Sequence, residues 1–178
     1  MKHFLILFAI LGFLKTAIAQ QQQVATKIFI VRHAEKETGK DPLLTTAGNT
    51  RAGDLMRALQ NEGIQIIYVS QYRRTQNTAD SLRIQFKIDT VHYTADTLCD
   101  NLVNTIMEHG DFGKTVLIIA HSNTIPQIIR KLGVKDYAYG DIADNDFDNL
   151  FVITYKKEKA KVKVRKYGAK LGGSATMQ

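Results

Sequence analysis

Histidine and arginine recur at three places in the chain where an apolar run ends. Arg32 and His33 end the first run, Arg73 and Arg74 follow the second, and His121 ends the third. A neutral imidazole is a good nucleophile, and an arginine offers a planar fork of donors that matches two oxygens of a phosphate. Taken singly, each residue is more often structural or a surface charge. Their chemistry therefore depends on whether the fold brings them together.

The apolar runs are predicted to be strands of a parallel sheet. Residues 27–32, 64–70 and 115–121 are apolar at successive positions, which is typical of strands covered on both faces. Apolar residues at 52–59 and 125–132 have helical spacing, which predicts helices between the strands. Two final strands are predicted at residues 149–156 and 161–167. The predicted fold class is α/β, a three-layer α/β/α sandwich with a mainly parallel central sheet.

Such a sheet would gather the histidines and arginines at one site. The carboxyl ends of parallel strands share one edge, and ligands bind in the crevice there. The formal net charge of +7 favours an anionic ligand, and we expect no nucleic-acid partner. The lysines of segment 156–166 alternate with small apolar residues, a pattern that favours a solvated edge strand over a polyanion-binding patch.

Four segments, taken in order, carry a resemblance to a known family. "VRHAEK" at 31–36, "LLTTAG" at 43–48, "SQYRRTQNTA" at 70–79 and "IIAHSNT" at 118–124 resemble the histidine phosphatase superfamily, the phosphoglycerate-mutase-like enzymes. The resemblance covers essentially the whole domain after residue 19. It implies a phosphoglycerate-mutase-like fold and a phosphomonoester hydrolase that needs no metal or other cofactor and acts on a small phosphorylated substrate.

The resemblance also implies a role for each site residue. His33 would be the nucleophile and form a phosphohistidine, while Arg32, Arg74 and His121 would hold the phosphoryl oxygens with help from Ser122. Aligning the Thr-Ala pair at 78–79 with the family selects Arg74 as the second arginine. The neighbouring arginine, at position 73, falls on a variable position and is expected at the rim or in solvent.

The proton donor to the leaving group is not assigned by these motifs. One branch of the family carries a catalytic glutamate after the second arginine, and another places an aspartate directly after the second histidine; this chain has neither, since that residue is Ser122. Asp96 and Asp100 are candidates by position and Glu35 by its proximity to His33. The chain also lacks the long insertions of the glycolytic mutases, which argues against mutase activity.

The first nineteen residues have the features of a secretory signal peptide. Lys2 and His3 precede an apolar run from Phe4 to Leu14, and small residues precede the expected cut between Ala19 and Gln20. Residues 20–178 are then predicted to form a single catalytic domain, ordered from about 26 to 167. We expect a periplasmic or secreted protein with no stable membrane insertion after cleavage; the sequence leaves its oligomeric state open.

Two further features are predicted to carry no chemistry. Cys99 is the only cysteine, so no internal disulfide can form, and it is expected to be a small buried residue. Asp144, Asp146 and Asp148 alternate as at the start of a calcium loop, but the positions that would need glycine and glutamate are Asn149 and Tyr155. This segment is expected to be a polar loop, at the mouth of the cleft.

Three alternative functions stay open from the sequence. The missing acid is compatible with a phosphate-binding module that has little catalysis, and with a phosphohistidine phosphatase, whose leaving group departs easily. A metal-dependent hydrolase would use His33, Glu35 and His121 as ligands. Arg32 and Arg74 disfavour that third alternative, because they would repel the cation.

Overall fold

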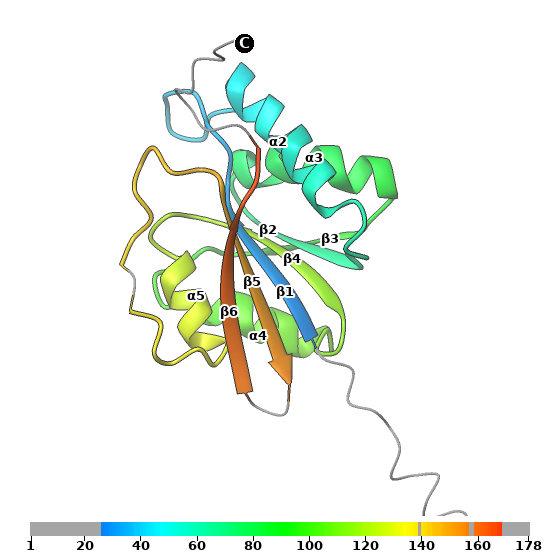
Figure 1. Cartoon of the computed structure of the whole chain (residues 1–178). Coiled ribbons are helices and arrows are strands. Elements are labelled where there is room, and N and C mark those ends of the chain that lie inside the picture. The colour runs from blue at the N-terminus through cyan, green and yellow to red at the C-terminus, as the bar shows by residue number, and fades with distance from the viewer. Residues whose placement is uncertain (1–25, 139, 157–158, 169–178) are drawn as a thin grey trace, which may run out of the picture.

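The computed structural model describes residues 26–138, 140–156 and 159–168, in which strands and helices alternate up to β5 (Figure 1). In chain order the elements are β1 (Thr26–Arg32), α2 (Thr46–Leu59), β2 (Ile66–Ser70), α3 (Arg73–Phe86), β3 (Thr90–Tyr93), α4 (Asp100–Glu108), β4 (Thr115–Ala120), α5 (Ile125–Lys131), β5 (Asn149–Lys156) and β6 (Lys159–Lys166). The signal-peptide prediction for residues 1–19 lies outside the described residues. Among those residues, no helix has the length and apolar character needed to cross a membrane.

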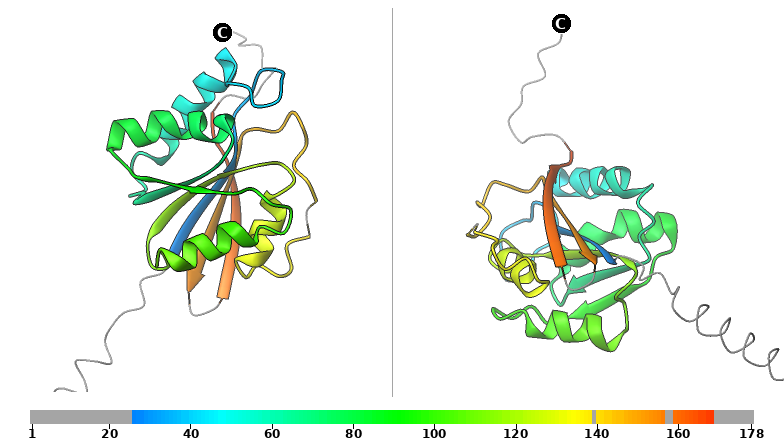
Figure 2. Two further views of the ribbon diagram at one scale, coloured as in Figure 1. Left: turned by 180° about the vertical axis from the view of Figure 1, so that it is seen from behind. Right: turned by 60° about the horizontal axis from the view of Figure 1, so that its bottom comes forward.

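The described strands form one six-stranded sheet in the order β3-β2-β4-β1-β5-β6. Strands β3, β2, β4 and β1 are parallel to their neighbours, whereas β5 is antiparallel to β1 and β6 is antiparallel to β5. Helices α2 and α3 cover one face of the sheet, and α4 and α5 cover the other (Figures 1 and 2). The predicted three-layer sandwich with a mainly parallel sheet is therefore confirmed.

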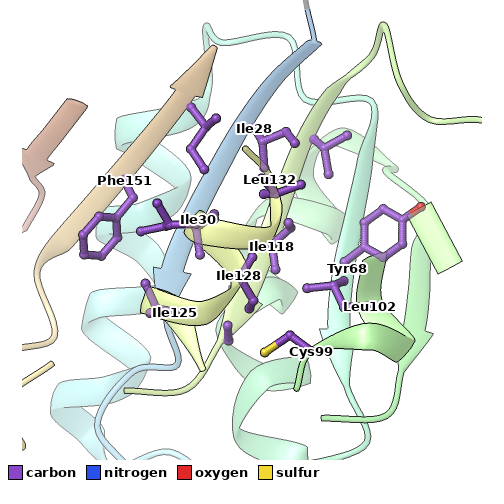
Figure 3. Packing of buried hydrophobic residues seen from close by; sticks show 14 of the residues in the cluster. Ile28, Ile30, Tyr68, Cys99, Leu102, Ile118, Ile125, Ile128, Leu132 and Phe151 are labelled. Atoms are coloured by element: carbon purple, nitrogen blue, oxygen red, sulfur yellow. The ribbon is translucent and has the colours of Figure 1, made fainter. Parts of the chain in front are cut away.

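Alternate residues of the central strands supply two separate cores. Ile28 and Ile30 of β1 pack with α4 and α5, in the cluster that Figure 3 shows, while Phe29 and Val31 pack with α2 and α3. All four side chains are fully buried. A sheet covered on both faces requires strands that are apolar at every position. Burial on both faces holds β1 in place, and with it the residues that directly follow the strand.

Helix α2 lies very close to the segment that follows β1. The side chain of Thr45 caps the helix by accepting a hydrogen bond from the backbone N–H of Gly48 at 3.0 Å, and the backbone N–H of Thr45 donates to the carbonyl of Glu35 at 2.9 Å. A Cβ atom at Gly48 would collide with that same carbonyl oxygen. Glycine is therefore needed at position 48, where it allows the helix to approach the loop that carries the site.

Candidate active site

The carboxyl ends of β1, β2 and β4 meet at an open cavity of about 320 Å³. Arg32 ends β1, the loop after β2 leads into α3 with Arg74, and His121 directly follows β4. The side chains around the cavity are mostly polar or cationic, and they include Arg32, His33, Lys36, Tyr72, Arg74, Asp96, His121 and Ser122. The structure thus brings together the two histidines and two arginines that the sequence placed at separate strand ends.

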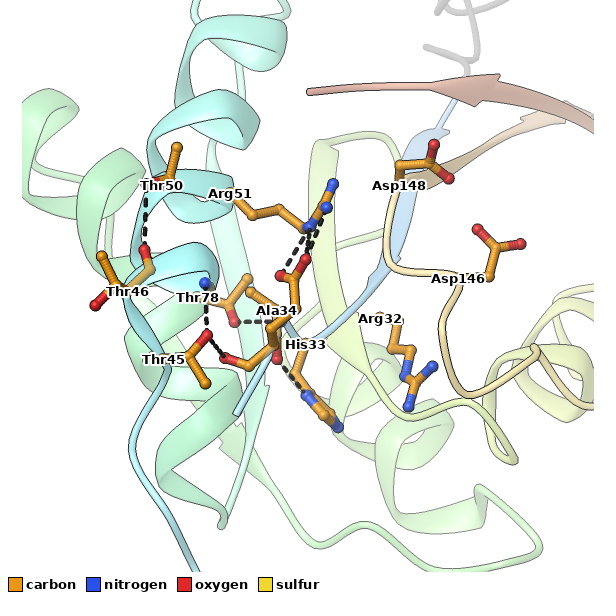
Figure 4. A network of polar contacts seen from close by, with 12 residues as sticks. Arg32, His33, Ala34, Thr45, Thr46, Thr50, Arg51, Thr78, Asp146 and Asp148 are labelled. Carbon is orange, nitrogen blue, oxygen red and sulfur yellow. Dashed lines mark hydrogen bonds and ion pairs between the residues drawn. The ribbon is translucent and has the colours of Figure 1, made fainter. Parts of the chain in front are cut away.

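His33 is held as a neutral imidazole with one nitrogen fixed. Its backbone N–H donates to the carbonyl of Ala120 at 2.9 Å, and its side chain is almost fully buried. Nδ1 lies 2.8 Å from the carbonyl oxygen of Ala34, which can only accept, so Nδ1 carries the proton and Nε2 keeps its lone pair (Figure 4). Burial lowers the pKa of His33 to about 3, and the nearby His121, Arg74 and Arg32 add to that shift.

Thr78 joins the loop of His33 to the helix of Arg74. Its hydroxyl accepts a hydrogen bond from the backbone N–H of Ala34 at 2.9 Å (Figure 4). The same hydroxyl donates to the carbonyl of Arg74 at 2.7 Å. Because Ala34 also provides the carbonyl that holds Nδ1 of His33, one buried hydroxyl connects the positions of the histidine and of α3.

The guanidinium of Arg32 is held by the loop before β5. Its Nη1 donates to the carbonyls of Ala143 at 2.8 Å and Asp144 at 3.1 Å, and its guanidinium carbon lies 4.1 Å from the ring centre of Phe147. Its Nε is buried without a hydrogen-bond partner, and burial lowers the pKa of Arg32. The aspartate-rich segment thus lies beside the cavity and orients an arginine, and its Asp146 and Asp148 form ion pairs with Lys166.

The adjacent arginines of α3 point to different places. The side chain of Arg74 is only 15% exposed, lines the cavity and approaches Nδ1 of His121 with its Nη2 at 3.4 Å. Its guanidinium carbon lies 4.1 Å from the ring centre of Tyr72, and its Nη1 is 3.9 Å from Asp41. Arg73 is exposed and is not among the residues that line the cavity.

A chain of hydroxyls fixes the tautomer of His121. The hydroxyl of Thr75 donates to the carbonyl of Tyr72 at 2.8 Å, so its oxygen is free to accept from Ser70 at 3.0 Å. The oxygen of Ser70 can then accept from Nε2 of His121, also at 3.0 Å. The proton of a neutral His121 accordingly lies on Nε2, and the lone pair of Nδ1 faces Arg74.

Burial and the two arginines keep His121 neutral. Desolvation lowers the pKa of His121 to about 4, and Arg74 and Arg32 contribute further. The ring centres of His121 and His33 lie 5.4 Å apart, with the rings tilted by 60°. The two arginines give this site a positive charge that can attract an anion, and Nε2 of the neutral His33 has a lone pair that can act as a nucleophile.

The structure separates the three carboxylates that were candidate proton donors. Glu35 is buried and binds Arg51, whose Nε lies 2.8 Å from both carboxylate oxygens, so it is not at the cavity. Asp100 forms an ion pair with Lys131 and does not line the cavity either. Only Asp96 does, and its two oxygens accept the backbone N–H groups of residues 100 and 101 at 3.3 and 3.2 Å.

The structure also shows where the remaining residues named from the sequence lie. Ser122 lines the cavity with partial exposure. Cys99 is buried, and burial raises the pKa of its thiol to about 11, as expected of a structural cysteine. The ligand set of the metal-dependent alternative is not assembled, because Glu35 turns to Arg51 and away from the histidines; in the described part of the chain no group of three potential metal ligands forms.

Sequence reasoning gave no role to several residues that shape this cavity. Lys36 and Tyr72 line it, Thr75 orients the hydroxyl of Ser70, and Phe147 packs on Arg32. Lys36 and Tyr72 lie within the motif segments, so a signal existed in their nearness to His33 and Arg74. Phe147 gave none, because its contact joins parts of the chain far apart in sequence.

Comparison with known proteins gives a family match over part of the chain. Residues 28–97 match the histidine phosphatase superfamily, branch 1. No functionally curated protein matches the sequence.

Solved structures share the fold over most of the chain. The protein histidine phosphatase SixA, in complex with tungstate, is 16% identical with a TM-score of 0.60 and covers 79% of this chain and 96% of its own. The alpha-ribazole phosphatase from Shigella flexneri is 14% identical with a TM-score of 0.61 and the same two coverages. A mycobacterial glucosyl-3-phosphoglycerate phosphatase is 15% identical with a TM-score of 0.58, covering 82% and 99%.

These structural likenesses establish a histidine-phosphatase fold, as the sequence motifs implied. The sequence match covers β1 to β3 and includes Arg32, His33 and Arg74, while the likeness in fold extends over the rest of the sheet. This chain is therefore similar to the histidine phosphatase superfamily in sequence over residues 28–97 and in fold over most of its length.

Proposed function

We propose that this protein is a metal-independent phosphatase that hydrolyses small phosphomonoesters through a phosphohistidine on His33. The observation that carries the proposal is the state of His33. Its imidazole is neutral, its Nδ1–H is held by the carbonyl of Ala34, and its Nε2 is free beside Arg32 and Arg74. A nucleophile held in this way beside fixed cations is what phosphoryl transfer requires.

The chemistry divides into two steps. In the first, Nε2 of His33 bonds to phosphorus, the bond from phosphorus to the ester oxygen breaks, and that oxygen leaves with a proton. In the second, water bonds to phosphorus and gives up a proton to the group that donated one in the first step, the phosphorus–nitrogen bond breaks, and phosphate leaves with His33 restored. Arg32 and Arg74, with Ser122 at the edge, hold the three oxygens that do not react, and His121 joins them as a donor once its Nδ1 takes up a proton. One such contact is commonly worth about 3–4 kcal/mol in the transition state.

Asp96 is the proton donor that this proposal favours for the first step. Among the three candidate carboxylates it alone lines the cavity. Its two oxygens accept the backbone N–H groups at the start of α4, and these hydrogen bonds hold the carboxyl group in place.

A phosphohistidine phosphatase is the second function to consider, because its first step needs little help from a proton donor. The imidazole of a phosphohistidine departs more easily than an alkoxide. The SixA structure, with the same fold and a bound tetrahedral oxyanion, is of a protein histidine phosphatase. We also propose that the protein is exported after cleavage between Ala19 and Gln20; the N-terminal residue of the mature protein, read by mass spectrometry, tests this.

The test of the phosphatase uses an aryl phosphate in the presence of EDTA. The wild-type protein should turn it over and give an initial burst of phosphoenzyme, and His33→Ala should abolish both. His92→Ala is the matched control, because His92 is exposed on β3 away from the cavity and should keep wild-type activity. Unchanged turnover in His33→Ala would contradict the mechanism. Binding of vanadate without any burst would instead indicate a phosphate-binding module.

A further inference from the structure

Lys36 brings a third cation to the cavity, and the proposed reaction does not use it. It lies three residues after His33 and lines the same cavity as Arg32 and Arg74. Those two arginines already supply the donors that the proposed reaction uses to hold the phosphoryl group. The role of Lys36 must therefore be sought in another part of the substrate.

The backbone of Lys36 is anchored, so its side chain starts from a fixed point. The residue forms an isolated antiparallel bridge with Leu44. On one side of it the backbone N–H of Glu37 donates to the carbonyl of Leu43 at 2.9 Å, and on the other the carbonyl of Glu35 accepts from Thr45 at 2.9 Å. A lysine on such a bridge can place its ammonium group at the rim of the cavity at little cost in backbone order.

The ammonium group of Lys36 has no carboxylate partner in the part of the chain that the structure describes. Its recorded contact is a weak hydrogen bond to the carbonyl of Glu37 at 3.4 Å. Other lysines are paired: Lys114 with Asp111, Lys131 with Asp100 and Lys166 with Asp148. The single carboxylate that lines the cavity, at position 96, accepts backbone N–H groups of α4. The charge of Lys36 is thus available to a ligand.

We infer that the substrate carries a second anionic group, a phosphate or a carboxylate, and that Lys36 binds it. The inference rests on the proposed function, since the first phosphoryl group must occupy the site at His33. A cavity of about 320 Å³ has room for more than a phosphate ion and falls at the lower end of the usual range for small-molecule sites. A phosphomonoester with a second negative charge fits its positive lining.

The experiment measures binding of three phosphonates that cannot be hydrolysed. Methylphosphonate has one anionic group, phosphonoacetate adds a carboxylate, and methylenediphosphonate adds a second phosphonate. Calorimetric titration compares the wild-type protein with Lys36→Gln. Lys40→Gln is the matched control, because Lys40 is exposed in the same loop and does not line the cavity, yet its loss changes the net charge equally.

The wild-type protein should bind at least one of the two doubly anionic ligands more tightly than methylphosphonate. Lys36→Gln should raise the dissociation constant of that ligand by about fivefold, as expected for one partly exposed charge pair. The dissociation constant of methylphosphonate should stay within about twofold of the wild-type value. If Lys36→Gln weakens binding of methylenediphosphonate, the second group is a phosphate; if it weakens binding of phosphonoacetate, the second group is a carboxylate. The inference would be overturned if Lys36→Gln weakened binding of all three ligands equally, or if Lys36→Gln and Lys40→Gln had equal effects on binding.

Binding is read without turnover, so the two proposals can fail separately. A protein that binds these ligands as expected but hydrolyses no phosphoester contradicts the proposed phosphatase and still supports an anion subsite at Lys36. A protein that turns over phosphoesters and gains no affinity from a second anionic group contradicts the subsite alone.

Discussion

Arg73 and Arg74 are adjacent and chemically identical, yet only one faces the cavity. Successive side chains of a helix diverge by about 100°, so two neighbours cannot face one anion equally well. Arg74→Ala should lower kcat/KM by about two orders of magnitude, the scale for losing a transition-state contact. Arg73→Ala should cost less than about tenfold, because an exposed cation mainly steers anions at low salt.

Steady-state kinetics of both arginine variants on one substrate checks this prediction. Raising the ionic strength should remove most of the remaining effect of Arg73→Ala and little of the effect of Arg74→Ala, because solvent screens only the exposed charge. If Arg73→Ala proves the more damaging change, the alignment of the Thr-Ala pair at 78–79 with the family is wrong.

Ser70 is predicted to control the proton position on His121. In the wild-type protein, nitrogen-15 chemical shifts of His121 should report a neutral ring with its proton on Nε2 at pH 7. Ser70→Ala removes the acceptor of that proton, so the tautomers should mix and kcat/KM should fall by about fivefold, the scale of one hydrogen bond. Ser81→Ala is the control, because Ser81 lies on the same helix as Thr75 but outside the hydroxyl chain. A wild-type spectrum with the proton on Nδ1 would contradict the prediction.

The site residues at strand ends could be predicted, and those in irregular loops could not. His33 and His121 follow continuous apolar runs, which mark buried parallel strands whose carboxyl ends share an edge. Glu35 became a candidate only because it is near His33 in sequence. The chain leaves the regular strand at Arg32, so no periodicity sets the direction of Glu35, and its buried partner Arg51 comes from α2.

The same contrast holds for helices and strands. Strand β1 could be predicted because two helical layers bury both of its faces. Strand β3 was not predicted, because it lies at the edge of the sheet and only its last residue, Tyr93, is buried. Helix α4 was missed for a similar reason: its fully buried positions are Leu102 and Ile106, too few to show a helical period.

Thr78 links helix α3 to the loop after β1 through the hydrogen bonds of its side-chain hydroxyl. Thr78→Val keeps the shape but leaves the buried N–H of Ala34 without its acceptor, so the free energy of unfolding should fall by about 1–3 kcal/mol. The loop carrying His33 should also shift, and kcat/KM should drop by about tenfold, since reactivity depends on small displacements. Chemical denaturation and steady-state kinetics measure the two effects.

Thr78→Ser is the matched variant, because it keeps the hydroxyl and loses only a methyl group. It should retain most of the activity and the larger part of the stability. If Thr78→Ser and Thr78→Val lose the same activity, the packing of the methyl group and not the hydrogen bond positions the loop.

Two buried histidines that stay neutral make the stability of the whole molecule depend on pH. Their pKa values, about 3 for His33 and about 4 for His121, lie below the ordinary value of 6.5 that they regain on unfolding. Between these limits the unfolded chain binds more protons than the folded one, so stability rises with pH. The contribution is complete above about pH 7 and is lost as the pH falls below 6.5, by up to about 1.4 kcal/mol per pH unit for each histidine.

Denaturation curves between pH 5 and pH 8 check this prediction, because the carboxylates with lowered pKa values lose their contribution only at more acidic pH. The double variant His33→Gln, His121→Gln cannot take up these protons. Its stability should depend less steeply on pH, and relative to the wild-type protein it should be more stable at pH 5 than at pH 8. Parallel curves for the two proteins across this range would show that both histidines titrate normally in the folded protein and that burial does not hold them neutral.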